Sequence, residues 1–439
     1  MKTVAIFVLV SVPLAVFTPS MGTLAADLPV TTSDWPQWQG PNRDGISSET
    51  GLLQQWPEGG PELAWKAAGL GPGFAGVSLQ NGRIYTMGQR DNKETVLALD
   101  ANQRGKPLWC TPIGDTAENG GYGGPRCTPT ADGDLVYALG SHGDLDCLNA
   151  ATGAIVWHKN LPLDFGGRMM SGWGYSESPL IDGDQLICTP GGQDALLVAL
   201  NKKTGAEIWR CGIPKAAQAE MTKKGNDGAG YSSIVISHAA NKKQYVQFVG
   251  RGLVGFSPDG KYLWGYNKIA NPVANISTPI VHDDNVFASA AYDSGAVQLK
   301  LVATPGGGIE AQPVYEIPSR TFQNHHGGMV LVNGYLYAGH GQKMGLPICL
   351  DWKTGHVIWG GDQRGPGEGS AAVAYADGRL YFRYEDGTMA LIGASPAGYK
   401  VYGTFKIPGV EQPSWSHPVI ADGKLYLREQ DALLCYKLK

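Results

Sequence analysis

The sequence predicts an all-β protein, an eight-bladed β-propeller with four-stranded blades. Three observations carry this prediction: a glycine-rich composition, a hairpin turn motif that recurs eight times, and a closing aromatic motif that recurs at the same spacing. A fixed period of about 40–50 residues, with room for four short strands, is typical of propeller blades.

The composition excludes several other classes of protein. Of 439 residues 62 are glycine, about twice the usual share. These glycines show no period of three, so the chain is not collagen-like, and 43% hydrophobic residues exclude intrinsic disorder. The formal net charge is -4, and a near-neutral chain lacks the basic surface of a nucleic-acid-binding protein. We therefore expect no nucleic-acid partner.

The N-terminus has the features of a secretory signal peptide. A single lysine, Lys2, precedes an apolar run over residues 4–17, and small residues follow up to Ala26. The run is shorter than the ~20 residues that span a bilayer, and no later stretch is long and apolar enough to do so. We expect a signal peptide over residues 1–26, a leader over 27–60 and the propeller over 61–439. The mature protein is then exported, periplasmic or extracellular.

The first repeated motif is Asn-Gly or Asp-Gly followed by an apolar and aromatic strand. This pair is a strong hairpin signal, because both central residues of the turn require positive φ. Six clear copies begin at Asn81, Asp132, Asp182, Asn333, Asp377 and Asp422, and degenerate copies lie at Asn241 and Asp283. Eight turns about 48 residues apart predict eight blades.

The second motif closes each unit with a Thr-Gly turn and a strand that carries an aromatic residue. Its best copy is LNAATGAIVW, over residues 148–157. The other copies end at Trp209 and Trp359, more loosely at Trp109 and Trp264, and with tyrosine at Tyr315 and Tyr402. Thr-Gly forms the turn between two strands, and we expect the aromatic ring to pack on the neighbouring blade.

The two chain ends complement each other. After Asp422 the chain supplies no closing aromatic strand, whereas residues 61–66 supply one that carries Trp65. Pairing these ends in blade 8 closes the ring and removes an exposed sheet edge.

The seven cysteines fall into two groups. Cys147, Cys349 and Cys435 share one slot of the repeat, where blades 1 and 3 have Ala98 and Ala199. A slot that accepts alanine is small and buried, so these thiols are expected to be inert. In an oxidising compartment one disulfide is open to the remaining four, Cys110, Cys127, Cys188 and Cys211.

A family resemblance follows from these motifs. The pattern Ala/Cys-Leu-Asp/Asn-x-x-Thr-Gly-x-x-x-Trp resembles the tryptophan-docking repeat of the pyrroloquinoline-quinone (PQQ) quinoprotein propellers, most closely in blades 2, 3 and 6. The leader DWPQWQGPNRDG, residues 34–45, resembles that of exported planctomycete-type PQQ-like proteins, some of which carry a polyvinyl-alcohol dehydrogenase label. The resemblance implies the propeller fold, and it leaves the chemistry open.

The candidate site lies in the segments that lead into the eight inner strands, here called the approach segments, which reach one mouth of the central channel. They are rich in glycine, aromatic and polar residues, which suit a ligand site or a water-filled channel lining alike. The catalytic candidates are Glu177, Glu368 and His326. The cofactor-binding candidates are Arg126, Arg168, Trp173, Tyr175, Tyr231, Asn275, Trp415 and His417.

Each residue type has a chemical reason. Arginine pairs with carboxylates, of which PQQ has three, and tryptophan stacks on planar rings. Glu177 or Glu368, with Asn275, suits Ca²⁺ binding or general-base chemistry. Histidine shuttles protons or binds metal. Adjacent histidines on a strand face opposite ways, so only one of His325 and His326 is expected at the channel. Without a third ligand in the sequence we expect no metal site.

Departures from the family's enzymes weigh against a cofactor. The chain has no adjacent Cys-Cys pair, no C-x-x-C-H haem motif and no Ca²⁺-binding group that maps residue by residue. PQQ with Ca²⁺ stays an open alternative. The sequence favours a scaffold in the cell envelope that binds a protein partner, a small molecule or a polysaccharide. The alternative is a quinoprotein-type dehydrogenase that oxidises an alcohol or a sugar.

Overall fold

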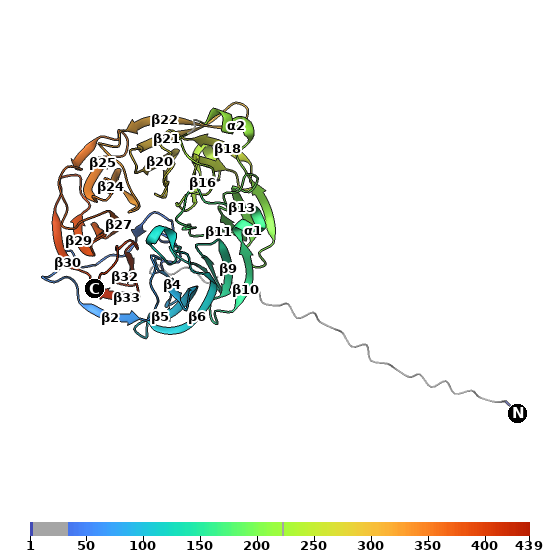
Figure 1. The fold of residues 1–439 in the computed structure, drawn as a ribbon, viewed down its shortest axis with the longest axis horizontal. Coiled ribbons are helices and arrows are strands. Elements are labelled where there is room, and N and C mark those ends of the chain that lie inside the picture. Colours follow the sequence, from blue (N-terminus) through green and yellow to red (C-terminus); the bar gives the residue numbers. More distant parts are fainter. Residues whose placement is uncertain (3–33, 222–223) are drawn as a thin grey trace.

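The computed structural model describes residues 1–2, 34–221 and 224–439. In this part of the chain eight blades of four antiparallel strands surround a central axis and form a closed ring (Figure 1). One of these sheets gains a fifth, parallel strand from the leader. The prediction of an all-β, eight-bladed propeller is therefore confirmed. Most of the predicted signal peptide lies outside the described residues, and the boundaries at 26 and 60 stay predictions.

The blades follow one another in chain order, and each is built from the channel outward. Blades 1 to 4 consist of β3 (Ser78–Gln80), β4 (Arg83–Arg90), β5 (Lys93–Asp100) and β6 (Lys106–Asp115); β7 (Thr130–Asp132), β8 (Leu135–Leu139), β9 (Asp144–Asn149) and β10 (Ile155–Asn160); β11 (Leu180–Asp182), β12 (Gln185–Cys188), β13 (Leu197–Asn201) and β14 (Glu207–Cys211); and β15 (Val235–Ser237), β16 (Gln244–Val249), β17 (Gly252–Phe256) and β18 (Tyr262–Tyr266).

The second half of the ring repeats this order. Blades 5 to 8 consist of β19 (Ile280–His282), β20 (Asn285–Ala290), β21 (Gly295–Ala303) and β22 (Ile309–Ile317); β23 (Met329–Val332), β24 (Tyr335–His340), β25 (Leu346–Asp351) and β26 (Val357–Gly360); β27 (Ala371–Ala376), β28 (Arg379–Tyr384), β29 (Thr388–Gly393) and β30 (Val401–Lys406); and β31 (Val419–Ala421), β32 (Lys424–Glu429), β33 (Ala432–Lys437) and β2 (Leu63–Ala68).

The predicted ring closure is confirmed in blade 8. Strand β2, from the start of the propeller, pairs antiparallel with the C-terminal strand β33 (Figure 1). In this pairing Trp65 stands opposite Cys435. The blade thus has no unpaired outer edge on β33, and both ends of the propeller are held by the same sheet.

The hairpin turns use two geometries. In blade 1 both Asn81 (φ 52°) and Gly82 (φ 73°) have positive φ, as the Asn-Gly motif predicts. In blade 2 Asp132 pairs with Leu135, so that Gly133 (φ 61°) is the first central residue of the turn. A glycine with positive φ at that position is the type II′ pattern, which needs only one left-handed residue.

The closing aromatic residues pack on the next blade, as expected. The indole Nε1 of Trp157 donates to the carbonyl oxygen of Lys202 at 2.9 Å, and the ring lies against Gly205, where a Cβ would come within 2.8 Å of it. Trp109, Trp209 and Trp359 make equivalent bonds to Ala150, Pro258 and Ser395.

Trp264 departs from this pattern, because its Nε1 donates to Gln244 of its own blade. In the next blade β21 and β22 are each nine residues long.

The leader closes the channel from the end opposite the approach segments. Within the leader the backbone of Trp35 pairs with Leu79, and further along β1 (Ile46–Ser47) pairs in parallel with the inner strand β27. Between them Arg43 is buried, and its guanidinium donates to the carbonyl oxygens of Ser178, Pro179 and Ile234. These carbonyls belong to the inner edges of blades 3 and 4, so the leader is a plug held by several blades.

The remaining described elements are small. They are the α-helices α1 (Leu161–Phe165) and α2 (Lys215–Glu220) and two 3₁₀ turns, Asn119–Gly121 and Ala239–Asn241. None of the helices in the described residues has the length and apolarity to cross a membrane.

All seven cysteines are free, so the disulfide that the sequence left open does not form among them. Cys147, Cys349 and Cys435 are fully buried, as the shared slot predicts, and burial raises the pKa of each thiol to about 12.

Candidate ligand-binding site at the channel mouth

The approach segments surround a cavity of about 250 Å³ at the open end of the channel. We call this cavity the cup. Its floor is the tip of the leader plug, because Trp38 and Gln39 line it from below. Its aromatic lining residues are Trp38, Phe74, Tyr122, Trp173, Tyr231, Tyr292 and Trp415. The sequence thus builds a closed-bottomed pocket rather than an open channel.

Two aromatic groups form the walls of the cup. On one side the ring centroid of Trp415 lies 4.7 Å from Phe74 and 4.8 Å from Tyr122. On another side Trp173 and Tyr231 meet edge to face at 6.0 Å. Tilted and edge-to-face contacts of this kind are the favoured geometries of aromatic pairs, and they leave ring faces available to a ligand.

The floor joins the leader to blade 8. The rings of Trp38 and His417 are 4.5 Å apart, and Trp38 Nε1 donates to Thr278 Oγ1 at 3.1 Å. Burial lowers the pKa of His417 to about 4, so this imidazole is neutral near pH 7.

Six of the eleven candidates from the sequence line the cup: Arg126, Trp173, Tyr231, His326, Trp415 and His417. Arg126 donates to the carbonyl oxygens of Trp173 at 3.0 Å and Tyr122 at 2.8 Å, which ties two approach segments together. Burial lowers its pKa to about 10, so Arg126 keeps its charge at neutral pH.

The structure places the other five candidates elsewhere. Tyr175 is buried and donates to the carbonyl oxygen of Pro190. Arg168 pairs with Asp227 on the surface at 3.1 Å, and Glu368 is exposed. The remaining two, Glu177 and Asn275, are buried behind the lining of the cup.

Glu177 and Asn275 are both fully engaged in structural hydrogen bonds. Glu177 accepts from Thr189 N at 2.7 Å, Thr189 Oγ1 at 3.0 Å and Gln247 Nε2 at 3.2 Å, and burial raises its pKa to about 8. Asn275 donates to the carbonyl oxygens of Val249 and Gly250 and accepts from Asn271. Both side chains hold adjacent blades together.

The residues around the cup therefore do not fit PQQ with Ca²⁺. None of the three side chains expected to bind Ca²⁺, Glu177, Glu368 and Asn275, lines the cup. The oxygens of Glu177 and Asn275 are also already hydrogen-bonded. Among the lining residues in the described part of the chain, only Arg126 and Lys343 carry a fixed positive charge, and a tricarboxylate needs more such partners.

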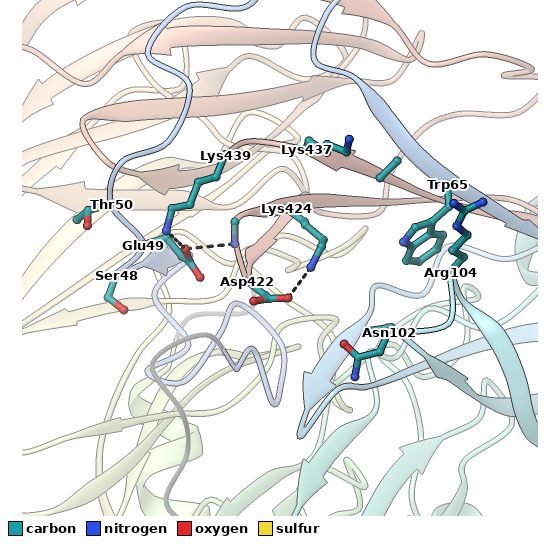
Figure 2. Close-up of a pocket in the computed structure, with 13 residues that line it drawn as sticks. Ser48, Glu49, Thr50, Trp65, Asn102, Arg104, Asp422, Lys424, Lys437 and Lys439 are labelled. Carbon is teal, nitrogen blue, oxygen red and sulfur yellow. Dashed lines mark hydrogen bonds and ion pairs between the residues drawn. The ribbon is translucent and has the colours of Figure 1, made fainter.

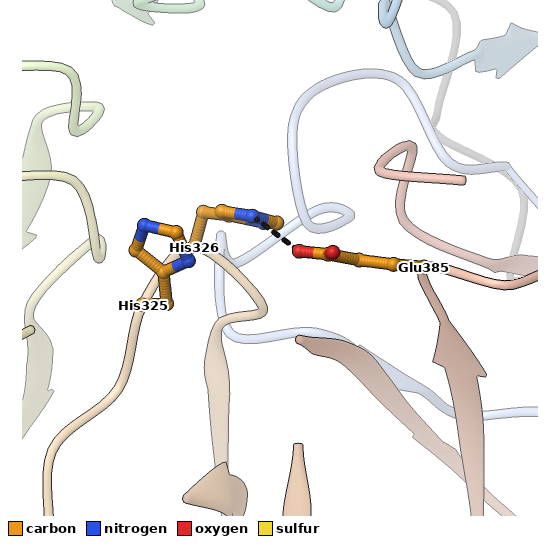
Figure 3. A group of neighbouring side chains, drawn as sticks. All are labelled: His325, His326 and Glu385. Carbon is orange, nitrogen blue, oxygen red and sulfur yellow. Dashed lines mark ion pairs between the residues drawn. The ribbon is translucent and has the colours of Figure 1, made fainter. Parts of the chain in front are cut away.

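A pair of histidines and a glutamate meet at the cup (Figure 3). His326 Nε2 lies 3.2 Å from Glu385 Oε1. His325 Nδ1 is 2.9 Å from Ser370 Oγ, and its Nε2 is 3.1 Å from the Tyr292 hydroxyl. Burial and the neighbouring His326 lower the pKa of His325 to about 3. Burial by itself would raise the pKa of Glu385, but His326, helped by Ser370, brings it down to about 2.

The expectation that only one of the two histidines reaches the channel is wrong. Both line the cup, and their ring centroids are 4.4 Å apart. The alternation rule holds within strands, whereas these residues lie in the loop before β23.

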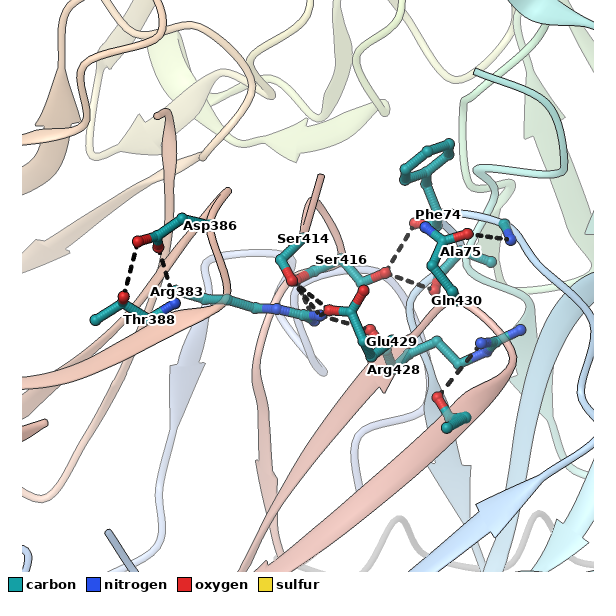
Figure 4. Close-up of polar contacts among 12 residues, drawn as sticks. Phe74, Ala75, Arg383, Asp386, Thr388, Ser414, Ser416, Arg428, Glu429 and Gln430 are labelled. Atoms are coloured by element: carbon teal, nitrogen blue, oxygen red, sulfur yellow. Dashed lines mark hydrogen bonds and ion pairs between the residues drawn. The ribbon is translucent and has the colours of Figure 1, made fainter. Parts of the chain in front are cut away.

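A buried ionic network of Arg383, Arg428 and Glu429 lies beside Ser414 and Ser416 (Figure 4). These two serines flank Trp415 in the chain. Arg383 donates to Glu429 Oε2 at 2.6 Å and to the carbonyl oxygen of Ser416 at 2.8 Å. Arg428, beside Glu429, donates to the carbonyl oxygen of Gly71 at 2.6 Å. The network joins blades 7, 8 and 1 under the segment 412–417, and within it the buried charges of Arg383 and Glu429 pair with each other.

Several cup residues were missed by the sequence analysis. Tyr292 and Lys343 line the cup, and Glu385 contacts His326 of its lining. All three lie in loops between the second and third strands of blades 5, 6 and 7, which reach the same mouth as the approach segments. Tyr292 (φ 58°) and Lys343 (φ 56°) adopt left-handed backbone, which is uncommon for side chains of this size. Trp38 and Gln39 were missed because a leader gives no sign that it enters the channel.

A second, larger concavity of about 710 Å³ lies where the ring closes between blades 8 and 1 (Figure 2). Its charged side chains are mostly paired: Lys439 with Glu49 at 3.0 Å and Lys424 with Asp422 at 2.5 Å. Lys437 pairs with Glu62. This open, polar groove lacks the enclosing aromatic walls of the cup, so the cup is the better candidate site.

Comparison with solved structures finds the same fold in two functional groups. BamB from Moraxella catarrhalis aligns with a TM-score of 0.58 and 12% identity, over 86% of this chain and 97% of that chain. The quinohemoprotein alcohol dehydrogenase of Comamonas testosteroni aligns with a TM-score of 0.63 and 15% identity, over 92% of this chain and 80% of that chain. A europium-containing methanol dehydrogenase aligns with a TM-score of 0.63 and 13% identity, over 90% and 89%.

No curated protein matches the sequence. A family model described as outer membrane protein assembly factor BamB matches residues 92–361, more than half of the chain. The repeats counted in the sequence, the eight blades and this match agree, and the chain belongs to this family of PQQ-like propellers.

Proposed function

We propose that this protein is an exported binding protein of the cell envelope whose aromatic cup holds the ring of a small sugar. The observation that carries the proposal is the cup itself, which is closed below by the leader and walled by Trp415 and Trp173. Ligand pockets combine apolar walls with a few placed polar groups, and here Ser176, Ser277 and Thr278 supply hydroxyl groups. A sugar ring offers both an apolar face and hydroxyls.

Export is part of the same proposal. The N-terminal 26 residues have the pattern of a signal peptide, and proteins with BamB-like and PQQ-type propellers are envelope or periplasmic proteins in general. A protein partner, as the name of the matching assembly factor implies for that protein, is compatible with a cup that stays open at one face.

The test is a titration of the full mature chain with a panel of mono- and disaccharides, read by tryptophan fluorescence and calorimetry. We expect saturable binding of at least one sugar and a loss of about tenfold in affinity in Trp415→Ala, because one aromatic contact contributes about 0.5–1.5 kcal/mol beyond its buried area. Trp209→Phe, remote from the cup, is the matched control. Absence of binding across the panel, or equal affinity in Trp415→Ala, contradicts the proposal.

The alternative function is a quinoprotein-type dehydrogenase, which the likeness to the two alcohol-oxidising propellers favours. If this alternative holds, the protein reconstituted with PQQ and Ca²⁺ acquires a stoichiometric quinone chromophore and oxidises alcohols or sugars with a dye acceptor. We expect neither, because Glu177 and Asn275 do not line the cup.

A further inference from the structure

Three metal-ligating side chains from two blades converge at the cup. His325 and His326 precede β23 of blade 6, and Glu385 follows β28 of blade 7. Their ligand atoms lie within 4.8 Å of one another (Figure 3). His326 Nε2 and Glu385 Oε1 are 3.2 Å apart, close to the ~3.4 Å that separates two ligands at tetrahedral angles around zinc.

The two closest atoms face each other as a buried ion pair. His326 Nε2 and Glu385 Oε1 are buried, and neither has a hydrogen-bond partner of good geometry in the described part of the chain. Buried polar atoms in native proteins nearly always have a partner. A cation bound between these two atoms gives both of them one.

The surrounding side chains can orient the ligands. Ser370 Oγ and the Tyr292 hydroxyl lie within hydrogen-bond distance of the two nitrogens of His325. Metal-bound histidines usually keep one such bond on the nitrogen that does not ligate. Binding through one nitrogen of His325 requires the exchange of one of these bonds and a small rotation of the ring, while the other bond holds it.

We propose that His325, His326 and Glu385 bind a divalent transition-metal ion of the zinc type, with the remaining coordination position facing the cup. Two imidazoles and one carboxylate suit such ions, and three protein ligands with an open position are typical of zinc sites that also bind a water or a ligand. The site lies in the wall of the cup but does not depend on sugar binding.

The chain offers a matched control. His158 Nδ1 lies 3.1 Å from Asp146 Oδ1, a histidine–carboxylate pair at nearly the same distance as His326 and Glu385. His158 is half exposed and lies on the outer strand β10, away from the cup. It therefore tests whether any histidine–carboxylate pair in this protein binds metal.

The experiment titrates Zn²⁺ calorimetrically, and Co²⁺ by its visible absorption, into the full chain after removal of any histidine tag and treatment with a chelator. We expect one equivalent to bind, and affinity to fall at least about tenfold in His326→Ala and Glu385→Gln, and about tenfold in Ser370→Ala. His158→Ala is expected to bind as the wild type does. Thermal melting of each variant shows that it is folded, and His326→Gln replaces His326→Ala if the latter is not.

The proposal is overturned if the wild-type chain binds neither ion, if His326→Ala and Glu385→Gln bind like the wild type, or if His158→Ala loses as much affinity. Because metal is the only ligand in this experiment, these outcomes are independent of the sugar titration.

Discussion

Behind the lining of the cup an ionisable side chain, Glu177, is buried. Glu177 lies on the approach segment of blade 3, two residues after Tyr175, and both point into the protein, whereas Ser176 between them lines the cup. This alternation is that of extended chain. A carboxyl group that sequence reasoning places in a site is thereby turned into the core, where its surroundings change its acidity.

Glu177 predicts a specific pH dependence of stability. Burial raises its pKa from 4.5 to about 8, so between these values the folded state holds a proton that the unfolded state releases. The unfolded state then binds fewer protons, and the free energy of unfolding falls as pH rises from about 4.5 to 8. Denaturant unfolding of the wild type and of Glu177→Gln at several pH values in this range measures the free energy of unfolding. In Glu177→Gln the free energy of unfolding should fall less steeply with pH than in the wild type. If the two plots of unfolding free energy against pH are parallel, Glu177 does not titrate in this way.

The cysteines give a second prediction at this scale. Cys110 is exposed and the other six are buried, and burial raises the pKa of Cys127 and Cys211 to about 12. Since the thiolate is the reactive form, a thiol reagent at pH 8 is expected to label one thiol in the native protein and seven after unfolding. Cys110→Ser should abolish the native reaction. Rapid labelling of two or more native thiols contradicts the prediction.

At the scale of elements, blades 1, 2, 3 and 6 are each joined to the next blade by a tryptophan on the outer strand. Trp157 on β10 reaches the turn between β13 and β14 of blade 3, bonds Lys202 and covers Gly205. The left-handed backbone of Gly205 (φ 70°) and the closeness of the ring both require glycine there. The Trp of one repeat and the Thr-Gly turn of the next repeat therefore pack against each other.

Trp157→Ala is expected to lower the free energy of unfolding by about 3–5 kcal/mol, the usual cost of removing a buried tryptophan side chain. Trp157→Phe keeps part of the packing but loses the hydrogen bond to Lys202. The loss of this bond is expected to lower the free energy of unfolding by about 1 kcal/mol. The neighbouring Val156 is 48% exposed, so Val156→Ala is the control and should change stability by less than about 0.5 kcal/mol. Denaturant unfolding measures all three, and equal losses in Trp157→Ala and Val156→Ala refute the docking role.

At the scale of the whole molecule, the leader turns a ring with a channel into a ring with a cup. Its plug contacts the inner strands of several blades, through Trp35, Arg43 and β1. Arg43 is 4% exposed, and desolvation lowers its pKa to about 10, so it stays charged within the channel. Pro179 O also accepts from Thr130 Oγ1 at 2.6 Å, so removal of Arg43 mainly affects the carbonyls of Ser178 and Ile234. A buried backbone oxygen that loses its donor is costly.

Arg43→Ala is therefore expected to lower the free energy of unfolding by about 3 kcal/mol or more, from buried carbonyls that lose their donor. Arg320, exposed on the surface, is the control, and Arg320→Ala should cost less than about 0.5 kcal/mol. Arg43→Ala should also weaken sugar binding, because Trp38 and Gln39 then lose their support at the floor of the cup. A stability equal to that of Arg320→Ala would mean that the plug does not depend on this side chain.

Part of the cup could be predicted from the sequence, because the repeats show where each inner strand begins and therefore which residues form the approach segment before it. Arg126, Trp173 and Trp415 lie before inner strands and line the cup, and their role in binding stays a prediction. The same register says little about loops between second and third strands, whose lengths vary, and Tyr292 and Glu385 were missed for that reason.

The repeats by themselves determined the fold: eight turns, eight closing aromatic positions and two complementary chain ends leave one arrangement, because each blade buries its faces only against its neighbours. Only the tertiary structure decided which side chains face the cup, since one residue along an extended segment reverses its direction, as between Ser176 and Glu177. It also brought together residues distant in the chain, Trp38 with His417 and His326 with Glu385. Those contacts depend on the closure of the ring, which no local pattern encodes.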